Sequence, residues 1–200
     1  MILAFSTSSA WASVAAIDQA NGVLWRDSKF APQGASGACL EMLKRMQEES
    51  DLRVAETEMF VSDIGPGSFT GVRVGVTLAK TFAWIHDKPV SGATSFDLVS
   101  ADSTVVLPSK KGEFFVRRPG EAPLRTIDLP FEPYVGFGAG VKPQTWPDAS
   151  RFWEILDRLV NVSATDFCPE YLIEPSISVP KNPFRQTSAS KHRFGEADHG

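Results

Sequence analysis

One glycine-rich stretch, residues 64–75, contains residue types that often bind phosphate through the backbone. It reads IGPGSFTGVRVG and follows an apolar run at 59–61. Glycine tolerates positive φ and proline fixes φ without donating a hydrogen bond, so residues 65–67 predict a tight turn. Ser68 is placed to cap a following helix. Because helix N-termini attract anions, Gly67 and Ser68 are weak candidates for anion binding.

The same stretch lacks the residues that complete known catalytic loops. Residues 69–71 read Phe-Thr-Gly, where a Walker-type loop needs Gly-Lys-Ser/Thr, and the glycine spacing misses a dinucleotide fingerprint by one residue. Ser68 follows Gly67 directly, so it does not form a Gly-x-Ser-x-Gly elbow. Asp63, just before the turn, has two interpretations. It is either a general base or a carboxylate that binds the backbone amides of the turn.

Metal chemistry is not expected from the histidines and cysteines. His86 ends a predicted helix, and His192 and His199 lie in the C-terminal tail. The two cysteines, Cys39 and Cys168, have no paired metal-ligand spacing. We therefore predict no catalytic residue, no cofactor and no metal site.

The composition is that of an ordinary globular protein. The 200 residues suit one sizeable domain or two small lobes. Charged residues make up 22% of the chain and the net charge is −4, so neither strong nucleic-acid binding nor a membrane surface is expected. No apolar run approaches the roughly 20 residues of a membrane helix, and the N-terminus does not resemble a secretory signal. A soluble cytoplasmic protein is expected.

The first half of the chain predicts a mixed sheet flanked by helices. Alternating and continuous apolar runs indicate three antiparallel strands, and crossover connections follow them. We take residues 1–102 as a first lobe. Its expected strands are 2–7, 11–17, 23–30, 57–62 and 89–92, and its expected helices are 36–49, 69–85 and 95–101.

The second half predicts a shorter lobe, residues 103–175. Its expected strands are 104–107, 113–117, 124–127, 134–140 and 171–173, and residues 148–159 form an amphipathic helix with Phe152, Ile155, Leu156 and Leu159 on one face. Residues 176–200 have the composition of a disordered tail. An RNA contact through Lys181, Arg185, Lys191 and Arg193 is the alternative use of this tail.

The helix at 69–85 has two apolar sides. We call Gly71, Gly75, Ala79 and Ala83 the small strip, and Val74, Leu78, Phe82 and Ile85 the bulky strip. Positions four apart share one face. Two glycines inside a helix cost about 1 kcal/mol each, so another backbone is expected to lie close to them. That backbone belongs either to the protein's own core or to a partner helix.

The residues 65–75, GPGSFTGVRVG, resemble the long signature of the TsaB (YeaZ) family. Further stretches resemble the family along most of the chain. These are residues 2–7 with 13–15, residues 111–115 (KGEFF), residues 134–138 (YVGFG) and residues 169–172 (PEYL).

The resemblance implies a fold and a function. The fold is that of the actin-like, sugar-kinase and Hsp70 ATPase superfamily, with two lobes of related topology. The function is that of a non-catalytic subunit that pairs with a TsaD-type transferase, recruits a TsaE-type ATPase and meets tRNA only through that complex. A homodimer can form when the partner is absent. The pairing helices correspond to 36–49 and 69–85, and the predicted partner-binding residues are Leu40, Leu43, Met46, Gly71, Val72, Gly75, Val76, Ala79, Phe82 and Ala83.

Departures from the family pattern favour this non-catalytic interpretation. Ser6 stands where the family usually has an aspartate, so a metal-bound phosphate would lose its carboxylate. Many members have a histidine near Ala35, and none is present here. Lys111 and Ile173 replace frequent arginines. The alternatives are a nucleotide enzyme of the actin-like fold, or a homologue of M22-type peptidases, and a tRNA-binding module. Leucine at Gly75 or Ala79 is predicted to abolish pairing and to leave the fold intact.

Overall fold

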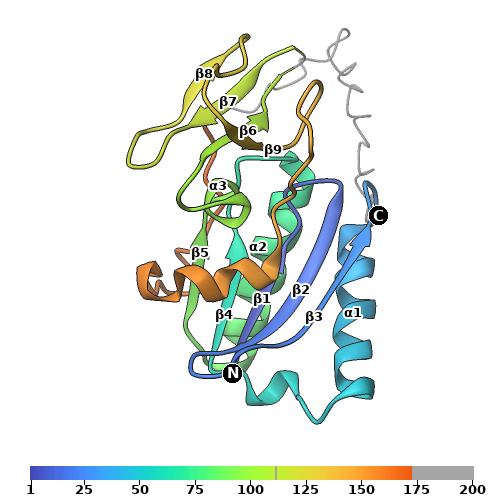
Figure 1. Cartoon of the computed structure of the whole chain (residues 1–200). Coiled ribbons are helices and arrows are strands. Elements are labelled where there is room, and N and C mark those ends of the chain that lie inside the picture. The colour runs from blue at the N-terminus through green and yellow to red at the C-terminus, as the bar shows by residue number, and fades with distance from the viewer. Residues whose placement is uncertain (111, 173–200) are drawn as a thin grey trace, which may run out of the picture.

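The computed structural model describes residues 1–110 and 112–172, which form two mixed sheets with helices around the first of them (Figure 1). The strands are β1 (Ile2–Ser6), β2 (Trp11–Asp18), β3 (Gly22–Phe30), β4 (Met59–Asp63), β5 (Val90–Ala93), β6 (Thr104–Pro108), β7 (Phe114–Arg117), β8 (Leu124–Thr126) and β9 (Tyr134–Gly136). The helices are α1 (Ala35–Glu49), η1 (Val54–Glu56), α2 (Phe69–His86), α3 (Ser95–Val99) and η2 (Ala149–Arg158).

The first sheet has the order β3-β2-β1-β4-β5. β1, β2 and β3 form an antiparallel meander, and β4 and β5 then add in parallel to β1 and β4. Hairpins produce antiparallel neighbours, whereas the crossovers through α1 and α2 produce parallel ones. The predicted meander followed by crossovers is confirmed.

The second sheet repeats this topology with fewer parts. Its order is β8-β7-β6-β9, in which β6, β7 and β8 form an antiparallel meander and β9 is parallel to β6. This is the arrangement of β1 to β4, without a fifth strand in the described residues. The predicted fold class, two related α/β lobes with the second one shortened, is therefore confirmed. The exact boundary at residues 102 and 103 stays a prediction.

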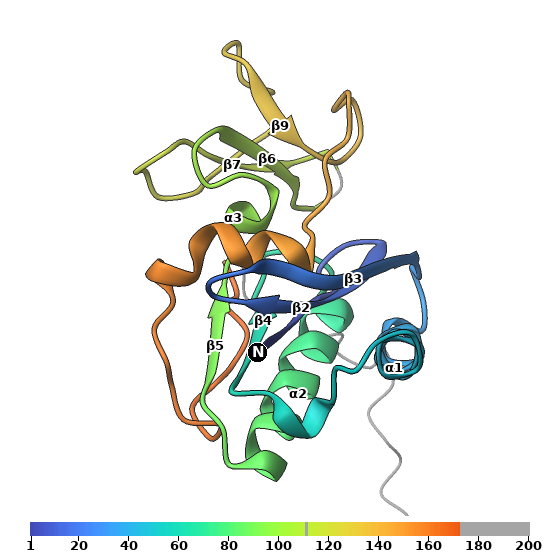
Figure 2. The ribbon, with the colours of Figure 1, turned by 60° about the horizontal axis from the view of Figure 1, so that its bottom comes forward.

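Alternating side chains of the first sheet supply two cores. On one face Leu3, Phe5 and Phe60 pack against α1 and α2, and on the other Ile17 and Val61 pack against η2. Figure 2 shows α1 and α2 on one side of the strands and η2 on the other. The second half of the chain therefore returns to the first lobe and covers its open face.

η2 corresponds to the amphipathic helix predicted at 148–159. Phe152 and Ile155 are buried, and Leu156 and Leu159 pack against the same cluster, so the predicted apolar face is confirmed. The segment is, however, a 3-10 helix with a non-helical residue at Ile155 (φ −131°, ψ 15°). Its contact with the sheet, and not regular α-helical hydrogen bonding, determines its conformation.

The small strip of α2 packs against the chain's own first strand and the loop that follows it. A Cβ added to Gly71 would lie 2.1 Å from the carbonyl oxygen of Thr7. A Cβ on Gly75 would lie 2.6 Å from Thr7 Oγ1 and 2.7 Å from Ser62 Oγ. Neither position has room for a side chain. The backbone that was expected nearby is therefore the protein's own at Gly71, whereas Gly75 meets the side chains of Thr7 and Ser62.

This packing corrects the predicted partner-contact residues. Eight of them are buried inside this chain, namely Leu43, Met46, Gly71, Val72, Gly75, Val76, Ala79 and Ala83. Phe82, from the bulky strip, stacks on Phe5 and Phe60. A buried residue cannot contact a partner directly, so of the ten only Leu40, 51% exposed, faces outward.

Three further predictions concern the end of the chain. Tyr171 and Leu172 are not in a strand. Lys111, Ile173 and the whole tail lie outside the described residues, and with them Lys181, Arg185, Lys191, Arg193, His192 and His199.

None of the helices in residues 1–110 and 112–172 combines the length and the apolar character that crossing a bilayer requires.

The packing of α2 predicts the effect of enlarging the small strip. Ala79→Leu should lower the free energy of unfolding by roughly 1–3 kcal/mol, because a larger side chain overpacks a fully buried position. Thr77→Leu, on the exposed side of the same helix, should change it by no more than about 0.5 kcal/mol. Urea unfolding of both variants tests this. Equal stability of the two would contradict the packing.

Candidate functional site

The most unusual polar cluster surrounds Asp63 at the end of β4. Its side chain is fully buried and accepts four hydrogen bonds. Ser6 Oγ lies 2.9 Å from Oδ2, which also accepts from Ser8 Oγ. The Gly65 amide lies 2.9 Å and Ser95 Oγ 2.6 Å from Oδ1. Asp63 therefore binds a turn amide, as one of its two interpretations predicted, and it is too deeply buried to act as a general base.

Burial dominates the electrostatics of this carboxyl. Loss of hydration raises the pKa of Asp63, and the hydrogen bonds from Ser8, Ser95, Gly65 and Ser6 oppose that rise. Among the residues that the structure describes, none forms an ion pair with it. The hydroxyl and amide donors are thus the groups that directly stabilise the charged form of this carboxyl.

The glycine turn is closed onto the loop that follows β1. The Ser68 amide donates to the Ser8 carbonyl oxygen at 2.7 Å, and a Cβ on Gly67 would lie 2.2 Å from that oxygen. Ser68 Oγ accepts from the Gly71 amide, which confirms the predicted helix cap. The Ser68 amide therefore already has an acceptor within the protein, and the weak anion site at Gly67 and Ser68 stays a prediction.

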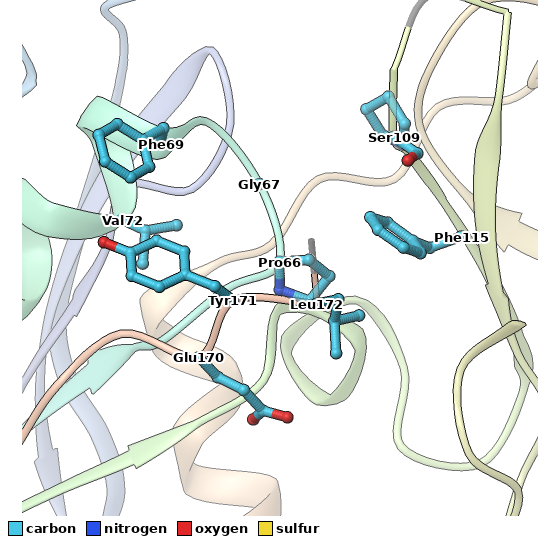
Figure 3. Close-up of a pocket in the computed structure, with 10 residues that line it drawn as sticks. Pro66, Gly67, Phe69, Val72, Ser109, Phe115, Glu170, Tyr171 and Leu172 are labelled. Carbon is cyan, nitrogen blue, oxygen red and sulfur yellow. The ribbon is translucent and has the colours of Figure 1, made fainter. Parts of the chain in front are cut away.

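A cleft of about 340 Å³ separates the glycine turn from the second lobe. Figure 3 shows Phe69, Val72 and Tyr171 on one side of it, and Ser109 and Phe115 of the second lobe on the other. Its described lining contains no lysine, arginine or histidine. A nucleotide triphosphate needs cations or free amides, so this lining does not suit one.

Residues 163–171, which follow η2, cross over α2, and we call this segment the strap. Lys80 Nζ donates to the carbonyl oxygens of Thr165 at 2.9 Å and Phe167 at 3.2 Å, and Phe167 is buried. The Glu170 amide donates to the Ile64 carbonyl oxygen at 2.8 Å. Sequence reasoning missed this strap because its irregular backbone has no periodic pattern to reveal the contact.

The opposite flank of α2 and the adjoining flank of α1 remain open. We call this surface the outer helix face and define it by Leu40 of α1 and by Val74, Leu78, Trp84 and Ile85 of α2. Trp84 is 74% and Ile85 60% exposed, whereas Val74 and Leu78 are half-buried. A hollow of about 320 Å³ lies beside them, lined by Ser36, Thr70, Arg73, Val74, Thr77 and Leu78. Val74, Leu78 and Ile85 of the bulky strip are therefore at least partly exposed, whereas Phe82 of the same strip packs in the core.

Charged side chains attach α1 to the edge strand β3. Lys29 pairs with Glu41 at 2.6 Å, and Arg45 pairs with Asp27. Such exposed pairs contribute about 0–1 kcal/mol each, so the buried residues of α1, among them Met42 and Met46, supply most of its attachment.

The described part of the chain contains no group of three or more His, Cys, Asp and Glu side chains that could hold a metal ion. Burial raises the pKa of the Cys39 thiol to about 12. Cys39 therefore stays protonated at neutral pH and is not a nucleophile.

Comparison with known proteins finds similarity to proteins of tRNA modification. The TsaD model, described as tRNA N6-adenosine threonylcarbamoyltransferase, matches residues 30–109, which include α1, the glycine turn and α2. The tRNA threonylcarbamoyladenosine biosynthesis protein TsaB of Bacillus subtilis is 32% identical over 101 residues, which are 50% of this chain and 44% of that protein. These matches support the resemblance to the TsaB/YeaZ family.

Solved structures of similar proteins agree with the fold of this chain. YeaZ from Pseudomonas aeruginosa superimposes with a TM-score of 0.69 at 19% identity, over 86% of this chain and 99% of that one. A second Pseudomonas aeruginosa structure, of an uncharacterized protein with similarity to peptidase YEAZ, has a TM-score of 0.73 at 16% identity, with the same coverage. The curated Bacillus relative is matched over less than half of its length.

Asp63 predicts a specific pH dependence. Its pKa in the folded state lies above the ordinary value of 3.8. Between these two pKa values the folded chain keeps a proton that the unfolded chain has lost, so the group's contribution to stability falls as pH rises. Asp63→Asn removes this titration, and its amide can still accept from Gly65 and donate to the serine hydroxyls.

Urea unfolding of both proteins between about pH 4 and about pH 7 measures the effect. We expect the stability of the native chain relative to Asp63→Asn to decrease as pH rises. A relative stability that increases with pH would mean that the hydrogen bonds outweigh burial and that the folded-state pKa is depressed.

Proposed function

We propose that this chain is a non-catalytic scaffold subunit in the synthesis of threonylcarbamoyladenosine in tRNA, and that it pairs with a TsaD-type transferase. The names of its relatives support the pathway, because the Bacillus protein is described as a tRNA threonylcarbamoyladenosine biosynthesis protein. In this proposal tRNA is met through the transferase, a TsaE-type ATPase joins the assembly, and the complex is cytoplasmic.

The observation that carries the pairing proposal is the outer helix face. Two neighbouring helices leave Leu40, Trp84 and Ile85 more than half exposed, with Val74 and Leu78 beside them. Grouped apolar side chains of this kind typically mark an interaction surface. The face also lies within residues 30–109, the part that matches the TsaD model.

The shape of this face suits another helix pair. The hollow beside Val74 and Leu78 is lined partly by short side chains, Ser36, Thr70 and Thr77. A ridge of larger side chains from a partner helix can enter such a groove. A stable pairing would bury about 1,200–2,000 Å² in total. A second copy of the chain can occupy the same face when the transferase is absent.

Several features support the non-catalytic part of the proposal. Ser6 replaces the carboxylate at the end of β1, and its hydroxyl is bound to Asp63. The glycine turn closes on Ser8, and the cleft lining that the structure describes lacks basic side chains. The described lining has one carboxylate, Glu170, and among these residues the phosphates of a nucleotide find no cationic side chain.

A charge on the outer helix face should prevent pairing. Leu78→Glu places a carboxylate where an apolar contact is expected, and we predict at least about tenfold weaker binding to the TsaD-type protein of the same source. Ile127→Glu is the matched control, because Ile127 is exposed on the other lobe. Co-purification and titration of both variants, with circular dichroism to verify folding, measure the effect. Undiminished binding of a folded Leu78→Glu chain would exclude this face.

The nucleotide-enzyme alternative has its own test. We expect isothermal titration of the isolated chain with ATP and magnesium to give no binding heat, because the cleft offers the phosphates no cation. A dissociation constant in the micromolar range would contradict the non-catalytic assignment and would leave the pairing face to be judged by the Leu78 variant alone.

A further inference from the structure

The carboxyl ends of the parallel strands β1 and β4 are where open α/β sheets usually bind their ligands. In this chain the place beneath the glycine turn holds a side chain of the protein itself. Asp63 is the last residue of β4 and is fully buried there.

The donors around Asp63 come from separate segments. Ser6 ends β1 and Ser8 lies in the loop after it, while Gly65 belongs to the glycine turn and Ser95 begins α3. Four donors converge on two oxygens, which is the arrangement that proteins use for a bound oxyanion.

The same cluster reaches the second lobe through α3. Asp97 of α3 pairs with Arg117 of β7, and Arg117 Nη2 also donates to the Ser100 carbonyl oxygen at 2.6 Å. α3 is thus bound on one side to Asp63, through Ser95, and on the other to a partly buried arginine. The position of one carboxylate therefore influences both the glycine turn and the connection between the lobes.

We propose that Asp63 is an internal ligand, whose carboxylate occupies a small-oxyanion site between the β1 loop, the glycine turn and α3. The site is complete in the native chain without any molecule from solution. Removing the carboxylate and keeping the donors should expose a site for a small free carboxylate. Formate has the carboxylate of Asp63 without its Cβ, so it is the appropriate probe.

Asp63→Ala tests this by chemical rescue. The variant should be destabilised in sodium chloride and restabilised, in a saturable way, by sodium formate at equal ionic strength. A ligand of three heavy atoms can bind with a dissociation constant of about 1 mM at best. At about ten times that constant the unfolding equilibrium constant should fall roughly tenfold. The native chain, whose site is filled, should show no such response.

Two control variants distinguish specific formate binding by the hydrogen-bond donors from the filling of a nonspecific cavity. Val61→Ala makes a cavity at a fully buried position two residues away on the same strand, next to apolar neighbours, and should not respond to formate. Asp63→Ala with Ser95→Ala loses one donor and should bind formate several-fold more weakly. Equal responses to formate and chloride, or an equal response of Val61→Ala, would overturn the proposal.

A second measurement applies if Asp63→Ala does not fold. Ser8→Ala should raise the unfolding constant of the native chain about tenfold, because it removes a hydrogen bond to a carboxylate. In the Asp63→Asn background the same change should cost several-fold less, which gives a coupling between the two positions. Additive effects would mean that the carboxylate does not organise its donors. Neither experiment needs a partner protein, so its outcome is independent of the pairing proposal.

Discussion

The close approach of α2 to β1 is the constraint on which the rest of this structure depends. Gly71 and Gly75 lie against Thr7, where no Cβ fits, and Thr7 Oγ1 donates to the Gly71 carbonyl oxygen at 2.8 Å. This contact sets the height of the helix above the sheet and its rotation about its own axis. With the small strip facing inward, Val74 and Ile85 on the neighbouring side of the helix stay partly or largely exposed. The outer helix face is thus a consequence of internal packing.

Polar interactions fix the elements that apolar packing leaves free. Apolar contacts set distances between layers but have little directionality, whereas Asp63 holds three loops in one arrangement through directed hydrogen bonds. The carbonyl oxygen of Ser8 accepts from the Ser68 amide at the start of α2. A loop that resembles a phosphate cradle is therefore a rigid start for a helix in this chain.

The strands, the glycine turn and its cap could be predicted because their signals are local. Ser68 caps α2 through an amide three residues away, and glycine and proline mark the turn whatever surrounds it. For Asp63, the bond to the turn amide could be predicted from the sequence, but the bonds from the serine hydroxyls could not. The Gly65 amide lies two residues away, whereas Ser6 and Ser95 lie 57 and 32 residues away and meet the carboxylate only when β1, β4 and α3 assemble. The strap of residues 163–171 had no pattern at all.

The sequence by itself determined the element order and the topology of the first sheet, and a long motif carried the resemblance to a family, since periodicity, turn residues and motifs are properties of neighbouring residues. Only the tertiary structure decided which apolar strip of α2 is core. Both strips are apolar at helical spacing, so periodicity ranks them equally. The decision came from the loop after β1 and from β4: the Thr7 carbonyl oxygen lies too close for a Cβ on Gly71, and the hydroxyls of Thr7 and Ser62 lie too close for one on Gly75. That packing leaves Val74, Leu78 and Ile85 at least partly exposed.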